Sequence, residues 1–97
     1  MEQKIKPTIL IVNDDLRLCE TRKMLLENCG AEVYTACTHP SDLVEKLRLP
    51  LDLVLIDATN VGFEQGEYIC NAVKKLDSSR CVAMLAKPEM GVNESTS

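Results

Sequence analysis

The chain has 97 residues, which is room for one domain with a modest core. Apolar residues make up 45% and charged residues 27%, a globular composition that argues against a disordered or fibrous chain. The formal net charge of -4 and the 3% of aromatic residues weigh against a nucleic-acid partner, which needs a basic patch or stacking rings.

The apolar runs of the sequence are short. The first, residues 9–12, is far below the length of a signal-peptide core or a membrane span, and no other run is long enough either. We therefore expect a cytoplasmic protein without a membrane partner.

The cysteines form no recognisable framework. Their number is odd and no two have the C-x-x-C spacing, which argues against a disulfide scaffold or a zinc site. We expect all five to be small buried apolar side chains in a reducing compartment: Cys19, Cys29, Cys37, Cys70 and Cys81.

Two periodicities alternate from the start of the chain. Residues 8–12 are a continuous apolar run, typical of a strand that is covered on both faces. A helical stripe follows, ended by Gly30, and residues 32–36 predict a second strand. The stripe consists of Leu18, Arg22, Leu25, Leu26 and Cys29.

The alternation continues in the second half. Thr38 is the predicted N-cap of a helix with Pro40 in its first turn and an apolar face over residues 43–47. Residues 51–56 predict a third strand, which ends at Asp57. A polar loop over 58–65, a helix with its apolar face at 69–76 and a last strand at 81–85 come next. We expect one domain over residues 1–87 and a flexible polar tail over 88–97.

Strands that alternate with helices predict an α/β fold with a parallel sheet and helices on both faces. In such sheets, ligands bind beyond the C-terminal ends of the strands. This rule singles out residues 13–15, Asp57 and residues 86–87.

Three carboxylates follow two of these strands. If the strands are neighbours, Asp14, Asp15 and Asp57 gather at one edge, where their repulsion favours a bound cation. Mg²⁺ prefers such oxygen ligands, and a carboxylate beside it can act as a nucleophile toward phosphorus. The alternative is that Asp14 and Asp15 only cap a helix and that Asp57 is a turn residue.

Residues 8–87 resemble the response-regulator receiver domain of two-component signalling. The resemblance rests on the segments 9–15, 30–36 and 52–57 in this order. It implies a flavodoxin-like, doubly wound parallel sheet, here with four strands in the order 2-1-3-4 and about three helices. It also implies Mg²⁺-dependent transfer of a phosphoryl group from a histidine kinase or phosphotransfer protein to Asp57. Asp14 matches a metal ligand, and Thr59 matches the residue whose backbone carbonyl completes the metal shell.

Several positions depart from the family. Asn13 replaces the first acid of the pair, so it would bind the metal weakly, through water. Ala86 replaces a Ser or Thr and has no hydroxyl for the phosphoryl group. We expect residues 81–86 to be the fourth strand, with the final strand and helices of the family missing. In the alternative alignment, Lys87 is the lysine that contacts the phosphoryl group, and its ammonium should reach Asp57.

Two functions remain open, and neither makes the chain an enzyme. The first is a phosphoacceptor module that uses Mg²⁺ and Asp57. The second is a pseudo-receiver that no longer switches and acts as an interaction module. In the second case the exposed last strand would form a homodimer or a domain-swapped dimer. The chain could also be one domain of a larger kinase or regulator.

Overall fold

The structure, a computed structural model, describes residues 6–87. Four parallel strands form one sheet in the order β2-β1-β3-β4, joined by three helices. This confirms the predicted fold class and strand order. The predicted tail, residues 88–97, lies outside the described residues. The elements are β1 (Thr8–Val12), α1 (Leu16–Asn28), β2 (Glu32–Ala36), α2 (Pro40–Lys46), β3 (Leu53–Asp57), α3 (Phe63–Leu76) and β4 (Val82–Leu85).

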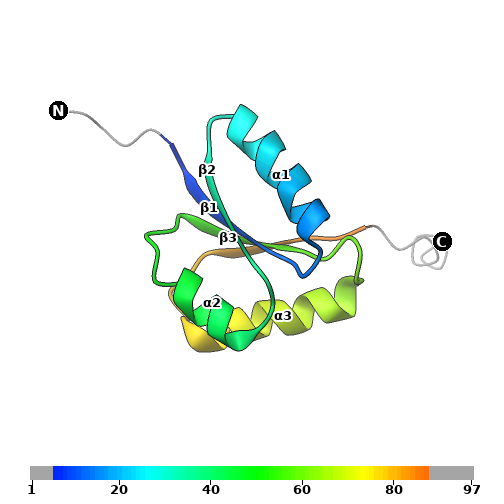
Figure 1. Cartoon of the computed structure of the whole chain (residues 1–97). Helices are drawn as coiled ribbons and strands as arrows, with labels where there is room; N and C mark the ends of the chain where they lie inside the picture. Colours follow the sequence, from blue (N-terminus) through cyan, green and yellow to red (C-terminus); the bar gives the residue numbers. More distant parts are fainter. Residues whose placement is uncertain (1–5, 88–97) are drawn as a thin grey trace, which may run out of the picture.

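The helices cover the two faces of the sheet unequally. Helix α1 lies on one face, and α2 and α3 lie on the other (Figure 1). The face under α2 and α3 carries the larger core, built around Leu10, Val54 and Ile56, which have no exposed surface. The face under α1 has a smaller core around Ile9, Ile11, Cys19, Ala31 and Val33.

The single helix on its face leaves apolar side chains of that layer in solvent. Leu53 and Leu55 of β3 are only half-buried, and Leu85 of β4 is 38% exposed. Leu25, which the stripe on α1 placed in the core, is 55% exposed. That part of the prediction was wrong because α1 packs mainly over β2 and β1 and does not extend over β4.

The starts of two helices differ from the sequence prediction. The N-cap of α2 is His39 rather than Thr38, and its imidazole accepts a hydrogen bond from the Ser41 amide. Helix α3 begins at Phe63, inside the predicted loop, after Gly62 turns the chain with a φ of 96°. Glycine adopts this left-handed conformation without the strain that a Cβ brings.

The prediction of five buried cysteines was also wrong. Cys19 is buried, whereas Cys29 and Cys81 are exposed and the other two are intermediate. Cys29 lies at the C-terminal cap of α1 and Cys81 precedes the edge strand β4, two places that no second layer covers.

Helix α3 approaches the sheet closely at Gly66. A Cβ at this position would collide with the Met84 sulfur and the Ala58 methyl group. The absence of a side chain therefore lets α3 pack against β4 and the end of β3. The contact lies at Ala58, the residue after Asp57.

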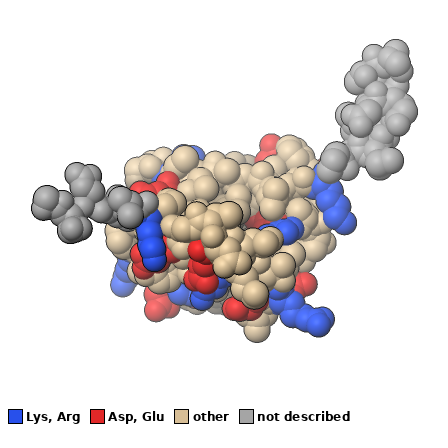
Figure 2. All heavy atoms as spheres, turned by 90° about the horizontal axis from the view of Figure 1, so that it is seen from above, with Lys and Arg blue, Asp and Glu red and all other residues tan. Residues whose placement is uncertain are grey.

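The visible face of the described surface carries charged side chains of both signs. Acidic and basic side chains are interspersed on the face shown in Figure 2, without a broad patch of one sign. None of the helices within residues 6–87 is long and apolar enough to cross a membrane.

Candidate functional site

The site lies where β1 and β3 end side by side. Val12 and Ile56 are register partners, so the next residues, Asn13 and Asp57, lie side by side at this edge of the sheet. Asp57 has no exposed surface although it is charged. It is the last residue of an inner strand that lies between β1 and β4. A carboxylate at such a depth needs hydrogen bonds or a counter-ion.

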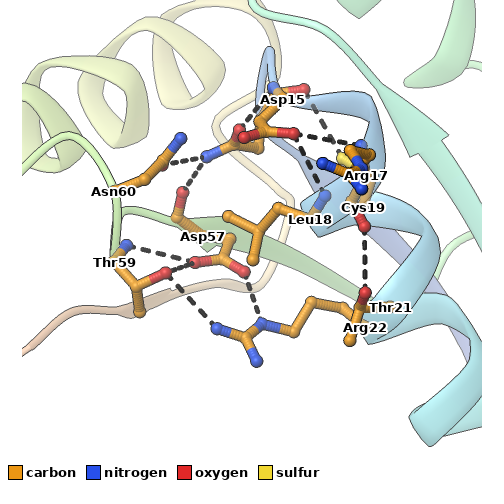
Figure 3. A network of polar contacts seen from close by, with 10 residues as sticks. Asp15, Arg17, Leu18, Cys19, Thr21, Arg22, Asp57, Thr59 and Asn60 are labelled. Atoms are coloured by element: carbon orange, nitrogen blue, oxygen red, sulfur yellow. Dashed lines mark hydrogen bonds and ion pairs between the residues drawn. The ribbon is translucent and has the colours of Figure 1, made fainter.

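Arg22 and Thr59 supply these partners. The Nε of Arg22 donates to Oδ2 of Asp57 at 2.6 Å. Thr59 donates to Oδ1 twice, from its hydroxyl at 2.7 Å and from its backbone amide at 3.1 Å. Arg22 also donates from Nη2 to the Thr59 hydroxyl at 3.3 Å, which closes a ring of contacts around the carboxylate (Figure 3).

These contacts keep Asp57 ionised. Burial by itself raises the pKa of the Asp57 carboxyl. The hydrogen bonds from Arg22 and Thr59, together with the charge of Arg22, outweigh burial and hold the pKa below its usual value. Asp57 is therefore a carboxylate at neutral pH, the form in which it can act as a nucleophile.

Asn13 organises the backbone around the site. Its Nδ2 donates to the Asp57 carbonyl at 2.5 Å and to Oδ1 of Asn60 at 2.8 Å. Its Oδ1 accepts from the Asp15 amide at 2.6 Å. The Asn13 side chain is thus fully engaged in joining the ends of two strands and the loop after β3.

The three carboxylates do not form one cluster. Both oxygens of Asp14 accept hydrogen bonds from Thr38, at the end of β2. Asp15 is the N-cap of α1 and accepts from the Arg17 and Leu18 amides. The alternative role of a helix cap therefore applies to Asp15, while Asp14 and Asp57 each have a separate set of donors.

The side-chain oxygens expected to bind Mg²⁺ already face hydrogen-bond donors. Within residues 6–87 no group of three or more His, Cys, Asp or Glu side chains is placed to hold a metal ion. Both oxygens of Asp57 and both of Asp14 accept from N–H or O–H groups, and the Asn13 oxygen faces an amide. As these side chains lie, they do not fit a magnesium site, which needs oxygen ligands directed at one ion.

Lys87 and Ala86 lie just beyond the end of β4. Leu85 is the register partner of Asp57, which makes residues 82–85 the strand next to β3. Lys87 is exposed, and among the described residues the ion-pair partner of Asp57 is Arg22. The contact that the predicted role of Lys87 requires is therefore not formed here.

Cys19 lies beneath Asn13 and is no candidate nucleophile. Its thiol donates to the Asn13 carbonyl at 3.5 Å, and burial together with nearby acids raises its pKa to about 11. The thiolate needed for redox or nucleophilic chemistry is scarce at such a pKa.

Arg22 is the site residue that the sequence analysis missed. It was placed among the apolar positions of α1 because it falls at helical spacing between Leu18 and Leu25. An arginine in an otherwise apolar stripe is itself a signal, since a charge on a buried helix face requires a partner. Asp57 and Arg22 are 35 residues apart in the chain, so the spacing alone did not identify that partner.

Comparisons with known proteins agree on the architecture. No family model and no curated protein matches the sequence. Solved structures do: the chemotaxis protein CheY4 of Vibrio cholerae and a response regulator from Thermotoga maritima each superpose with a TM-score of 0.66. The fold is that of CheY-like response regulators.

Sequence similarity to these two proteins is low. Identity is 19% and 20%, and the match covers 93% and 94% of this chain. The match covers 76% and 75% of the two solved chains. Identity at this level establishes the architecture, and the function must be argued from the site.

Proposed function

We propose that this chain is a receiver-like signalling module in which Asp57 accepts a phosphoryl group from a histidine kinase or a phosphotransfer protein. The main support is the position of Asp57, a buried, ionised carboxylate at the C-terminal end of an inner parallel strand. Ligands of open α/β sheets bind at this edge.

The proposed transfer uses groups that already surround Asp57. A carboxylate oxygen of Asp57 attacks phosphorus, the P–N bond of the donor phosphohistidine breaks, and the imidazole leaves with the electron pair. The Arg22 guanidinium and the Thr59 hydroxyl are hydrogen-bonded to the attacking group. They are therefore close enough to stabilise negative charge on the transferring oxygens. The Mg²⁺ ion that the sequence predicts takes no step in this scheme, because the side chains as they lie do not fit the ion.

The test is incubation of the whole chain with acetyl phosphate and Mg²⁺, followed by intact-mass measurement. We expect one phosphoryl group on the wild type and none on Asp57→Asn. The variant Glu45→Gln is a matched control because it removes an exposed carboxylate of α2, away from the site. The proposal fails if the wild type gains no mass with any phosphoryl donor, or if Asp57→Asn gains as much as Glu45→Gln.

A second candidate is the pseudo-receiver, which binds a partner without phosphorylation. The specific support is the α1 side of the sheet, where Leu25, Leu53, Leu55 and Leu85 keep exposed apolar surface. We propose that a second copy of the chain covers this surface by pairing along β4.

The geometry of β4 suits this pairing. The carbonyls of Cys81 and Leu85 accept from β3, so residues 81, 83 and 85 direct their backbone groups inward. In a parallel pair the alternate residues point away, which leaves the N–H and C=O groups of Val82 and Met84 at the outer edge. Within residues 6–87 no strand pairs with that edge. An open edge of this kind is a template for a strand of another chain.

Sedimentation velocity over a range of concentrations tests the dimer. We expect a dimer for the wild type and a monomer for Ala83→Lys, which places a charge on the exposed face of β4. Val44→Lys, at an exposed position of α2 on the opposite side of the sheet, should leave the dimer intact. A wild type that stays monomeric at high concentration would contradict the second candidate.

A further inference from the structure

We infer that Arg22 is the resident cation of this site, and that Mg²⁺ binds Asp57 only by displacing it. The inference rests on the proposed function in that it takes Asp57 as the centre of the site. It adds that this chain carries on α1 the positive charge that a divalent metal would bring.

The first argument is the ion pair itself. Nε of Arg22 is 2.6 Å from Oδ2 of a carboxylate with no exposed surface, and the Arg22 side chain is itself only 27% exposed. A buried carboxylate that loses its counter-ion is strongly disfavoured. If Arg22 moves away from Asp57, another cation therefore has to take its place beside the carboxylate.

The second argument is the direction of the neighbouring groups. Thr59 donates to the other Asp57 oxygen from both its hydroxyl and its amide. The Asp14 carboxylate is held by Thr38, and the Asn13 amide donates toward the Asp57 carbonyl. Each of these contacts directs an N–H or O–H group at an oxygen, an arrangement that suits a guanidinium and its carboxylate better than a metal, which needs several oxygen ligands aimed at it.

The third argument is the chemistry of arginine. A guanidinium stays charged at every pH that a protein tolerates, and it is less strongly hydrated than an ammonium. Arg22 therefore supplies a counter-charge to the Asp57 carboxylate without a metal in solution. Because its Nη2 also reaches the Thr59 hydroxyl, the same side chain lies over the carboxylate and covers it.

Titration with Mg²⁺ alone tests the competition. The amide signals of Thr59 and Asn60 in nitrogen-15 NMR spectra report binding, since the Thr59 amide donates to Asp57 and Asn60 is the next residue. We expect Arg22→Gln to bind Mg²⁺ roughly 10- to 100-fold more tightly than the wild type, the range that loss of a charged hydrogen bond allows.

Arg17→Gln is the matched control. It removes the same charge from the same helix, at an exposed position whose side chain does not reach Asp57. Its Mg²⁺ affinity should equal that of the wild type. The inference is overturned if Arg22→Gln binds Mg²⁺ no more tightly than Arg17→Gln, including the case in which neither binds.

A measurement on the wild type guards against a variant that does not fold. The Nε–H of Arg22 should give a signal protected from solvent exchange, and Asp57→Asn should shift it. Saturating Mg²⁺ should abolish the protection. A bound Mg²⁺ ion that leaves the Arg22 signal unchanged would overturn the inference.

The titration contains no phosphoryl donor, so its result is separate from that of the phosphorylation test. Tighter Mg²⁺ binding by Arg22→Gln without any mass gain would uphold the inference and reject phosphoryl transfer. A mass gain at Asp57 with unchanged Mg²⁺ affinity in Arg22→Gln would do the reverse.

Discussion

Nδ2 of Asn13 lies 2.5 Å from the backbone oxygen of Asp57, so a neutral amide joins the ends of β1 and β3 beside the acceptor. A carboxylate cannot donate this hydrogen bond. At position 13, an acid would therefore face the Asp57 carbonyl and the Asn60 oxygen without a proton to share. The amide stabilises the strand ends in the absence of a metal.

Asn13→Asp should destabilise the fold by about 1–3 kcal/mol, because two buried hydrogen bonds are lost and a negative charge is added near Asp57. Saturating Mg²⁺ should restore part of this loss, and urea unfolding with and without the ion measures both effects. Asn71→Asp, on the exposed side of α3, is the control and should show neither. Equal stability of Asn13→Asp and the wild type without Mg²⁺ would show that the hydrogen bonds of the Asn13 side chain contribute little to the stability of the fold.

The ion pair between Arg22 and Asp57 predicts strong coupling in a double-mutant cycle. Arg22→Gln leaves a buried carboxylate without its cation and should lower the free energy of unfolding by about 1–3 kcal/mol. Combining it with Asp57→Asn should cost less than the sum of the two single changes. Additive effects in urea unfolding would mean that the pair does not interact in solution.

The lowered pKa of Asp57 predicts a loss of stability in acid. A carboxyl whose folded pKa is below its unfolded value of about 3.9 stabilises the fold above that value. Its contribution disappears as the pH falls through the folded pKa. Thermal unfolding between neutral pH and strong acid should therefore show a smaller decline for Asp57→Asn. Some decline remains, because hydrogen bonds also lower the pKa of Asp42 and Asp77. Identical profiles for the wild type and Asp57→Asn would contradict the prediction.

Gly66→Ala should destabilise the protein although alanine is the better helix former. Intrinsic propensity alone would favour alanine by about 1 kcal/mol. The added methyl collides with Met84 and Ala58, and overpacking of this kind costs about 1–3 kcal/mol. Asn71→Ala, on the exposed side of the same helix, should be neutral or stabilising. Chemical denaturation distinguishes the two, and a stabilised Gly66→Ala would show that α3 can move away from β4.

The sequence was sufficient for the fold because each element carries its own periodic signal. Residues 8–12 and 32–36 matched their strands to the residue, the first as an apolar run and the second as a short segment between Gly30 and the predicted cap at Thr38. The start of α3 was missed because Gly62 has a backbone turn but no side-chain cap to mark it. The exposure of Leu25 was missed because a stripe on one helix does not reveal how far the neighbouring layer extends.

The site was predictable in position but not in its contacts. Strand-end logic identified Asp57 and Asn13, since both follow apolar strands that prove to be register neighbours. The separate partners of Asp14 and Asp57 depend on tertiary distances that no local pattern encodes. Lys87 was considered because it follows the last strand and precedes a proline, whereas the cation that reaches Asp57 comes from α1.

The central position of β1 has a consequence for how the chain folds. β1 pairs with β2 on one side and with β3 on the other, and Thr8 and Asp52 at the start of the second pairing are 44 residues apart. Closing a loop of this length costs chain entropy before the pairing of β1 with β3 adds any stability. We expect the α1-containing half to assemble through nearby contacts and the pairing of β3 with β1 to be slower. Asp57 meets Arg22 only when β3 joins β1, so the ion pair should form with that long-range step.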